Sequence, residues 1–388
     1  MRILGDWDLA EELVQDAAMA ALEHWPIDGV PRNPGAWLMT TARRRAVDRL
    51  RRDTRYRDRL AQLGREATEM DRPMATGGPL AADDRLRLIF TCCHPALSRE
   101  AQVALTLRTI GGLETPAVAR AFLVPEATVA QRLVRAKRKI RDAGIPYRVP
   151  EASELPERLE RVLAVLYLIF NEGYLAAMGD AAERRQLAAD AEWLTSLLVR
   201  LMPDEPEPMG LLALMRLHLA RVDARFDPDG SLVLLPEQDR ARWDAAAIAD
   251  ATALVERALR RGRPGPYQLQ AAIVAIHATA PSYAETDWSE IVALYDRLLA
   301  LQPSPVVALN RGLALAELVG PAAALAQIDP LRGRLESYHL FHAARGELLR
   351  RLDRPHEAHL ANTRALELTD NPAERALLQK RLDAPESS

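Results

Sequence analysis

Residues 99–141 constrain the fold most, because two helical stretches flank a tight turn and a long basic run follows them. Apolar side chains recur through residues 99–110 at the spacing of one helix face. Gly111-Gly112 then ends this helix, since residues without a Cβ accept positive φ angles. Thr115-Pro116 starts a second, short helix, with the hydroxyl expected at the N-cap and the proline in the first helical position. This order predicts a helix-turn-helix.

The basic run forms the last helix of this segment. Pro125 opens it, and Leu133 and Ile140 are predicted to face inward along residues 127–141. The outer surface is predicted to carry Thr128, Gln131, Arg132, Arg135, Lys137, Arg138, Lys139 and Arg141. A helix of this kind enters the DNA major groove in helix-turn-helix proteins, which makes DNA the expected partner. An ordinary bundle with a solvated basic helix remains the alternative.

A second basic element lies nearer the N-terminus. A helix is predicted over residues 35–52, and residues 43–59 hold nine arginines and three aspartates. Guanidinium groups at this density neutralise phosphates well. Taken alone, the cluster also fits a solvated helix end favoured by the helix dipole. Two basic helices, joined by a flexible segment at residues 64–80, favour DNA binding more strongly than either helix does.

The charges divide the chain of 388 residues into two unlike parts. Residues 1–150 hold 25 lysines and arginines and 19 acidic residues, whereas residues 151–388 hold 26 and 35. This asymmetry predicts a front part that binds a polyanion and an acidic back part with another role. The chain lacks a signal peptide and a run of 18 apolar residues, so a soluble, cytoplasmic protein is expected. The length of 388 residues predicts two or three domains, and the low aromatic share with many Ala, Leu and Arg residues predicts an all-α chain.

The first helix is predicted over residues 8–25. Its apolar positions are Leu9, Leu13, Ala17, Ala20 and Leu22. Three prolines and a glycine make residues 26–34 a loop before the basic helix begins.

These runs together resemble a known family. Residues 5–12 (GDWDLAEE), 33–38 (NPGAWL) and 42–52 (ARRRAVDRLRR) are similar to region 2 of the extracytoplasmic-function (ECF) sigma factors of bacterial RNA polymerase. The helix-turn-helix resembles region 4 of the same sigma-70 family. Residues 85–95 (RLRLIFTCCHP) and 171–174 (NEGY) resemble the subgroup in which a helical domain with tetratricopeptide-like repeats follows region 4.

The resemblance implies a division into domains. Residues 1–63 correspond to region 2, residues 64–82 to a linker, residues 83–146 to region 4, and residues 147–388 to the helical C-terminal domain. One departure is that the helix of region 2.1, which usually precedes region 2.2, is missing before residue 8. We therefore expect the helix over residues 8–25 to expose apolar surface.

The resemblance also implies roles for individual residues. Contact with the clamp helices of the largest polymerase subunit is implied for Glu11, Glu12, Gln15 and Asp16. Contact with the −10 element is implied for Asn33, Trp37, Arg43, Arg44, Arg45, Arg49 and Arg52, with a core position as the alternative for Trp37. In related factors a base is flipped out of the strand at this loop. Base-edge contacts in the −35 element are implied for Thr128, Gln131, Arg132 and Arg135, and backbone contacts for Lys137, Arg138, Lys139 and Arg141.

Two short motifs leave alternatives open. Cys92-Cys93-His94 could suggest a metal site, but three consecutive residues cannot provide tetrahedral ligation, and a buried helix end is favoured. Residues 171–174 follow an apolar helix and fit either a helix cap, which is favoured, or a polar pocket. No cofactor or metal is expected.

The back part repeats. Residues 311–315 (RGLAL) and 345–349 (RGELL) are offset by 34 positions, and so are Ala324 and Ala358. This is the period of tetratricopeptide units, and residues 288–303, with Tyr295 in a large core position, resemble the second helix of an earlier unit. Residues 151–280 are predicted to be helical, with breaks at 202–209 and 227–236. Stacked helix pairs favour a surface for a soluble protein partner; a packed domain without a partner is the alternative.

The sequence therefore predicts a promoter-specificity subunit that binds core RNA polymerase, at its clamp helices and flap, and promoter DNA. The repeat domain is expected to modulate this activity. A helix-turn-helix regulator that acts without polymerase is the second hypothesis, and a pure scaffold is the third. An enzyme is the least favoured class, because no nucleotide loop, metal cluster or catalytic triad is present in the sequence.

Overall fold

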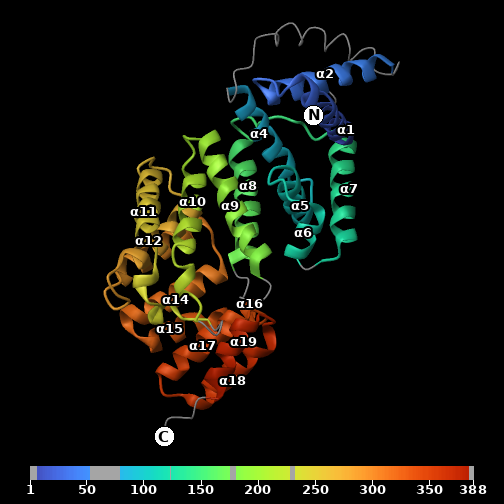
Figure 1. Ribbon diagram of the computed structural model, residues 1–388. Coiled ribbons are helices and arrows are strands. Elements are labelled where there is room, and N and C mark those ends of the chain that lie inside the picture. Colours follow the sequence, from blue (N-terminus) through green and yellow to red (C-terminus); the bar gives the residue numbers. More distant parts are fainter. Residues whose placement is uncertain (1–6, 53–78, 123, 175–180, 228–231, 384–388) are drawn as a thin grey trace. The chain divides into compact units, whose positions relative to one another are not determined.

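The computed structural model describes residues 7–52, 79–122, 124–174, 181–227 and 232–383 (Figure 1). The chain divides into two compact units, Met1–Val165 and Leu166–Ser388. Apart from an isolated bridge between Phe226 and Leu232, the described residues are helical or irregular, which confirms the all-α prediction. None of the described helices is long and apolar enough to cross a bilayer.

The first unit holds the two basic elements. Its helices are α1 (Trp7–Asp28), α2 (Pro34–Arg52), α4 (Pro79–Cys92), α5 (Arg99–Thr109), α6 (Thr115–Ala121) and α7 (Glu126–Asp142), followed by the first part of α8 (Leu155–Tyr174). Helix α4 thus begins inside the stretch predicted as a linker, and the rest of that stretch, residues 64–78, lies outside the described residues.

Helix α1 is longer than the sequence predicted. It continues through Pro26 to Asp28, so the predicted loop over residues 26–34 is shorter than expected. Gly29 ends the helix instead: it has a φ of +80°, and its N–H donates to the Trp25 carbonyl at 3.0 Å. A proline in the last turn costs little, because few later residues depend on the hydrogen bond that it removes.

The apolar face of α1 agrees only in part with the prediction. Leu13, Ala17 and Ala20 are buried, but Leu22 is 72% exposed and belongs to the opposite side of the helix. Val14 and Met19 are exposed there too, at 62% and 57%. The expectation that this helix exposes apolar surface is therefore confirmed.

The helix-turn-helix comprises α5, α6 and α7. The Ser98 hydroxyl caps α5, and Gly112 has a φ of +75° in the turn, as the glycine pair predicted. The N-cap of α6 is Glu114, not Thr115, so that Thr115 and Pro116 occupy the first two helical positions. Proline is equally acceptable there, because no N–H of the first turn has a partner within the helix. The apolar face of α7 is buried against α5 and α6.

The second unit is helical in the part that the structure describes, with short 3-10 turns and the isolated bridge between Phe226 and Leu232. After the last part of α8 come α9 (Ala181–Leu201), α10 (Pro206–Leu219), α11 (Ala245–Leu259), α12 (Pro266–Thr279), α13 (Trp288–Leu301), α14 (Pro305–Val319), α15 (Pro321–Ile328), α16 (Arg332–Leu335), α17 (His339–Arg351), α18 (Pro355–Leu368) and α19 (Pro372–Asp383). Helix α10 packs against α9, α11 and α12 at the centre of one apolar core (Figure 1). A second core lies among α14, α15, α17 and α18.

The structure contains the predicted repeat of 34 residues. Helix α17 begins 34 residues after α14, and α18 begins 34 residues after α15. In each pair a glycine lies at the helix crossing: a Cβ on Gly312 would collide with Ile328, and one on Gly346 with Asn362. These partners are also 34 positions apart, so the two pairs share one packing scheme.

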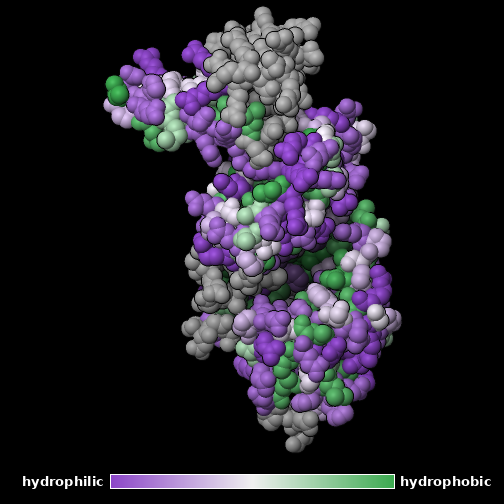
Figure 2. Space-filling view, turned by 90° about the vertical axis from the view of Figure 1, so that its right-hand side faces the viewer, coloured by the Kyte–Doolittle hydropathy of each residue, from purple (hydrophilic) through white to green (hydrophobic). Residues whose placement is uncertain are grey.

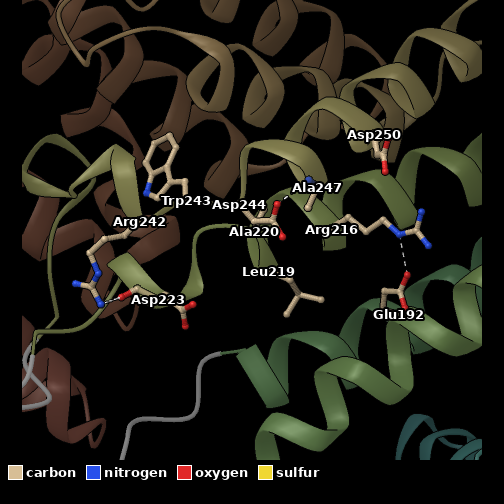
Figure 3. A pocket seen from close by; sticks show the side chains of 10 residues that line it. All are labelled: Glu192, Arg216, Leu219, Ala220, Asp223, Arg242, Trp243, Asp244, Ala247 and Asp250. Atoms are coloured by element: carbon tan, nitrogen blue, oxygen red, sulfur yellow. Dashed lines mark hydrogen bonds and ion pairs between the residues drawn. The ribbon is translucent and has the colours of Figure 1, made fainter.

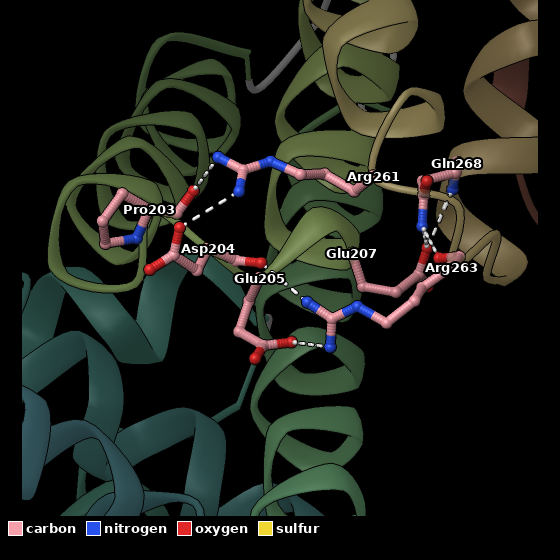
Figure 4. Close-up of polar contacts among 7 residues, drawn as sticks. All are labelled: Pro203, Asp204, Glu205, Glu207, Arg261, Arg263 and Gln268. Carbon is pink, nitrogen blue, oxygen red and sulfur yellow. Dashed lines mark hydrogen bonds and ion pairs between the residues drawn. The ribbon is translucent and has the colours of Figure 1, made fainter.

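Helix α12 is fixed to α10 by a buried carboxylate (Figure 4). Glu207 accepts hydrogen bonds from the N–H groups of Tyr267 and Gln268 at 3.0 and 3.1 Å, which satisfies the first turn of α12. Burial raises the pKa of Glu207. Nearby, Arg261 forms an ion pair with Asp204 at 3.1 Å. The predicted break over residues 202–209 is thus an ordered turn with α10 beginning at Pro206.

Candidate nucleic-acid interface

The outer face of α7 is a stripe of solvent-exposed side chains. Its exposed members at helical spacing are Ala127, Ala130, Gln131, Val134, Arg135, Arg138 and Arg141. Lys139 is also exposed, beside the stripe. Thr128, Arg132 and Lys137 were predicted to be on the outer surface as well, but they are half-buried along its edges. The stripe is therefore narrower than the prediction.

Val134 lies in the middle of this stripe and was missed by sequence reasoning. Its side chain is 66% exposed, between Gln131 and Arg135 on the helix surface. Val134 shares the stripe with the smaller Ala127 and Ala130, and an exposed apolar side chain on a basic helix has the chemistry to contact the methyl group of thymine. The three-residue spacing from Gln131 was the signal that could have identified it.

Lys137 makes a specific contact within the first unit. Its Nζ lies 2.7 Å from the Glu11 carboxylate of α1, and the lysine side chain is only 16% exposed. The structure thus brings together one residue predicted to contact DNA and one predicted to contact polymerase. Glu12 and Gln15 of α1 are exposed.

The basic end of α2 is described only in part. Arg44 is exposed, and Arg43 and Arg45 are half-buried, with Arg45 paired with Asp16 of α1 at 3.6 Å. The side chains of Arg49 and Arg52 lie outside the described residues.

The start of α2 is anchored by the two residues predicted to contact the −10 element. The Asn33 side-chain oxygen accepts a hydrogen bond from the Ala36 N–H at 3.1 Å and caps the helix. The Trp37 ring packs edge-on against Trp25, with centroids 5.5 Å apart. Trp37 is half-buried, so it has both a packing contact and an accessible edge.

The cysteine pair lies at a buried helix end, as predicted. Cys92 and Cys93 are 0% and 1% exposed, and both are free thiols. Burial raises the pKa of the Cys93 thiol to about 12 and that of Cys92 well above its ordinary value. No group of three or more metal-ligating side chains occurs within the described ranges.

A buried amide next to the cysteines was not identified from the sequence. The Gln102 side-chain nitrogen donates to the His94 carbonyl at 2.8 Å and reaches two neighbouring carbonyls. It therefore satisfies backbone groups at the turn between α4 and α5 and fixes the first helix of the helix-turn-helix. A glutamine within an apolar helix face is the signal that could have predicted this role.

Residues 171–174 form the last turn of α8 itself, so they are part of the helix that they were predicted to cap. The Tyr174 ring stacks on Phe170, with centroids 5.4 Å apart, and Arg225 lies over its other side at 4.1 Å. The Arg225 guanidinium also donates to the Tyr174 carbonyl at 2.8 Å, and this contact caps the end of α8. The favoured cap hypothesis was wrong about which residue does the capping.

Three parts of the chain match known protein families. Family models match residues 1–56 (Sigma-70 region 2), residues 87–140 (Sigma-70, region 4) and residues 158–259 (Family of unknown function, DUF6596). The ECF RNA polymerase sigma factor SigK of Mycobacterium tuberculosis (strain ATCC 25618 / H37Rv) is 30% identical over 37% of this chain and 75% of its own length. This chain belongs to the ECF sigma factors of the sigma-70 family.

Two further relatives are similar to this chain. SigK of Mycobacterium ulcerans (strain Agy99) is 28% identical over 36% of this chain and 75% of its own length. An uncharacterized protein of Rhizobium meliloti (strain 1021) is 46% identical over 99% of this chain and 91% of its own length. No solved structure matches the chain. The SigK matches cover only the part of this ECF sigma factor that carries the two basic helices, so the repeat-containing part is a C-terminal extension.

Proposed function

We propose that this ECF sigma factor binds core RNA polymerase in the cytoplasm and directs initiation by reading a −10 and a −35 element. The phosphodiester chemistry belongs to the polymerase, so the chain itself is not an enzyme. The observation that carries the proposal is the exposed stripe on α7. In this stripe the hydrogen-bond donors of Gln131 and Arg135 share a face with the Val134 side chain.

The stripe has the composition that a major-groove reader needs. Gln131 offers an amide for adenine, Arg135 a guanidinium for guanine, and Val134 a methyl surface for thymine. Arg138, Lys139 and Arg141 lie one or two turns further along and supply charge for the phosphate backbone. The half-buried Thr128, Arg132 and Lys137 are assigned to the edges of the same contact.

Region 2 is proposed to engage the polymerase and the −10 element. Glu12, Gln15 and the exposed Val14 and Met19 give α1 a mixed polar and apolar surface for the clamp helices. Glu11 and Asp16 reach this surface once their contacts with Lys137 and Arg45 open. Asn33, Trp37 and the arginines of α2 are proposed to receive the −10 strand, because aromatic and guanidinium groups stack on and neutralise single-stranded DNA.

The C-terminal extension is proposed to modulate this activity, in cis or through a soluble protein partner. Its support is the net negative charge of residues 151–388, which complements the basic helices, and the stacked helix pairs of its repeats. Figure 2 shows hydrophilic residues interspersed with hydrophobic ones on the visible surface. A mixed surface of this kind is compatible with weak protein contacts.

In vitro transcription from the region upstream of the gene, with core polymerase and the full chain, tests the proposal. We expect specific transcripts that Arg135→Ala lowers about tenfold, the effect of about 1.4 kcal/mol at one base contact. Arg364→Ala is the matched control, since Arg364 is an exposed arginine of α18 paired with Glu367. Duplex binding without any core binding or transcript would instead establish a polymerase-independent regulator.

Modulation is tested by comparing the full chain with one that ends at residue 150, after circular dichroism has verified its helical content. A change in transcript yield or in core affinity supports modulation. Equal yield and equal affinity would overturn it.

A further inference from the structure

The chain that follows α7 folds back onto α4, the helix that precedes the helix-turn-helix. The Tyr147 hydroxyl donates to the Asp84 carbonyl of α4 at 2.9 Å, and Ile145 and Pro150 of the same connection are buried. Helix α8 then begins at Leu155. All of these residues belong to the first unit, so region 4 and the start of the C-terminal extension lie within one compact unit.

The first turn of α8 carries an arginine that caps α4. Nη2 of Arg158 donates to the Phe90 carbonyl at 2.6 Å, two residues before α4 ends at Cys92. Carbonyls in the last turn of a helix have no partner within the helix, and a guanidinium satisfies one of them while its charge interacts favourably with the helix dipole. Burial lowers the pKa of His94, two residues beyond α4, and the charge of Arg158 lowers it further. Arg158 therefore lies at the C-terminal end of α4.

Beyond Arg158, the first half of α8 buries one apolar face. Leu159, Val162 and Leu163 are 6%, 0% and 2% exposed, at the spacing of three and four residues that defines one side of a helix. Arg161 is exposed on another side. This end of α8 is therefore packed in the first unit and is not a free linker.

The end of α4 is also held by the helix-turn-helix itself. The Gln102 side chain of α5 donates to the His94 carbonyl at 2.8 Å, and α5 packs against both α4 and α7. The turn between α4 and α5 thus receives one side chain from the extension and one from the helix-turn-helix. Because α7 packs on α5, the position of this turn affects where the exposed stripe of α7 lies.

The contact coincides with two boundaries in the sequence. Phe90 and His94 lie within residues 85–95, the run that resembles the subgroup with a helical extension. The match to region 4 ends at residue 140, and the match to the family of unknown function begins at Arg158. The motif and the first residue of the matched extension therefore occur together at one hydrogen bond.

We propose that the first turns of α8 serve as an additional helix of region 4, and that Arg158 is a positioning residue for recognition of the −35 element. Arg158 acts through the Phe90 carbonyl: it holds the turn from which α5 supports α7. The inference rests on the proposed reading of the −35 element by α7. A chain that ends at residue 150 lacks Arg158, so the test uses full chains with single substitutions.

Thiol reactivity tests the contact between Arg158 and α4. Cys92 and Cys93 are the two cysteines of the chain, and both are buried at the end of α4. Arg158→Met keeps an apolar stem and removes the guanidinium. Its thiols should react with dithiobis-nitrobenzoate about tenfold faster than those of the wild type under native conditions, because the end of α4 opens more often. Arg158→Lys, which can still donate to the carbonyl, should react at nearly the wild-type rate.

Transcription with core polymerase tests the positioning role. The yield from the upstream promoter, divided by the yield from the same promoter with a scrambled −35 element, gives a −35 ratio. Arg158→Met should lower this ratio about fivefold, because the base contacts of α7 lose their alignment. Its affinity for core polymerase and its yield from the scrambled template should be those of the wild type. Arg158→Lys should restore most of the ratio.

Two controls separate positioning from a general loss of stability. Arg161→Met removes an exposed arginine of the same helix. Arg216→Met removes an arginine of the second unit that lines a pocket of about 550 Å³ and lies 2.8 Å from Glu192 (Figure 3). The second variant is expected to lower stability without changing α4. Both controls should keep the wild-type thiol reactivity and the wild-type −35 ratio.

A wild-type rate of thiol reaction in Arg158→Met would overturn the proposal. A wild-type −35 ratio in this variant, despite reactive thiols, would also overturn it, and so would a lowered ratio in Arg216→Met. A wild-type chain that gives no polymerase-dependent transcript would overturn the proposed function instead. The −35 ratio is then measured as the affinity for intact against scrambled promoter duplex, and the thiol reaction needs no promoter.

Discussion

On α7, Arg135 extends from an exposed helix face and forms no ion pair within the described part of the chain, whereas Arg345 of α17 is 15% exposed and lies 2.8 Å from Asp329. Arg351 of the same helix pairs with Glu317 of α14 at 2.6 Å, and Arg311 pairs with Asp296. The same residue type is therefore exposed on α7 and forms contacts between neighbouring helices in the repeats. The difference lies in whether a carboxylate from another helix is within reach.

A third environment sharpens this contrast, because Arg221 and Arg240, which both lie over the indole ring of Trp243, are neither exposed nor paired with carboxylates of the described residues. The pKa of His218 is lowered to about 3, first by burial and then by the charges of Arg221 and Arg225. As the pH falls through the ordinary value of 6.5, the unfolded chain takes up a proton at this residue and the folded chain does not. The stability of the folded state must therefore decrease between pH 6.5 and about 3, by roughly 1.4 kcal/mol for each pH unit.

This predicts the largest effect. Between pH 7 and pH 4.5 the wild-type chain should lose roughly 2.7 kcal/mol more stability than a His218→Gln chain, which lacks the titrating ring. Urea unfolding at the two pH values measures the difference. Equal losses in the two chains would show that the His218 ring takes up its proton in the folded state.

Arg345→Ala is the next test, because it removes a side chain that is only 15% exposed and that pairs with the 40% exposed carboxylate of Asp329. We expect a loss of about 1 kcal/mol in the free energy of unfolding, with the −35 sequence preference unchanged. Arg135→Ala should do the opposite. Its free energy of unfolding should stay within about 0.5 kcal/mol of wild type, and its transcription from the promoter should decrease. Urea unfolding and transcription of both variants complete the cross-comparison. A promoter defect in Arg345→Ala, at a concentration where it is fully folded, would contradict the division.

Val134 tests whether the exposed face of α7 reads bases and not only charge. The substitution Val134→Ser replaces the apolar methyl surface of the side chain with a small hydroxyl group. It should reduce the preference for thymine at one position of the −35 element about fivefold, or about 1 kcal/mol. Transcription from templates that carry each base at that position measures the preference. An equal effect on all four templates would assign Val134 to a packing role.

The sequence predicted the parts of the molecule in which local chemistry decides the structure. The helix-turn-helix followed from Gly112 and Pro125, and the repeats followed from a period that places Gly312 and Gly346 at equivalent crossings. The sequence did not predict features that depend on contacts between residues far apart in the chain. Leu22 has the composition of a core residue, but no other element of the described part covers it.

The candidate sites show the same limit. The outward direction of Gln131 and Arg135 followed from helical spacing, but the burial of Lys137 did not, because its partner Glu11 is 126 positions away. The arginines around Trp243 come from separate turns between α10 and α11 and were not identified at all. Only the fold shows that they share one ring and that no carboxylate accompanies them.

The contact between Lys137 and Glu11 gives the smallest expected effect and the most specific one. It joins α7 to α1, the two helices proposed to bind DNA and polymerase, and the Glu11 carboxylate holds the Lys137 ammonium while the pair is closed. With the Glu11 side chain 41% exposed, the pair should contribute about 0.5 kcal/mol, and this contribution should decrease as salt is added. Glu11→Gln should therefore bind promoter duplex about twofold more tightly at low salt, where Lys137 becomes available, and equally at high salt. Fluorescence anisotropy at the two salt concentrations measures this, with Glu12→Gln as the control on the same helix. Weaker binding by Glu11→Gln would mean that the pair holds α7 in its DNA-binding position, and the closed contact would then assist recognition instead of competing with it.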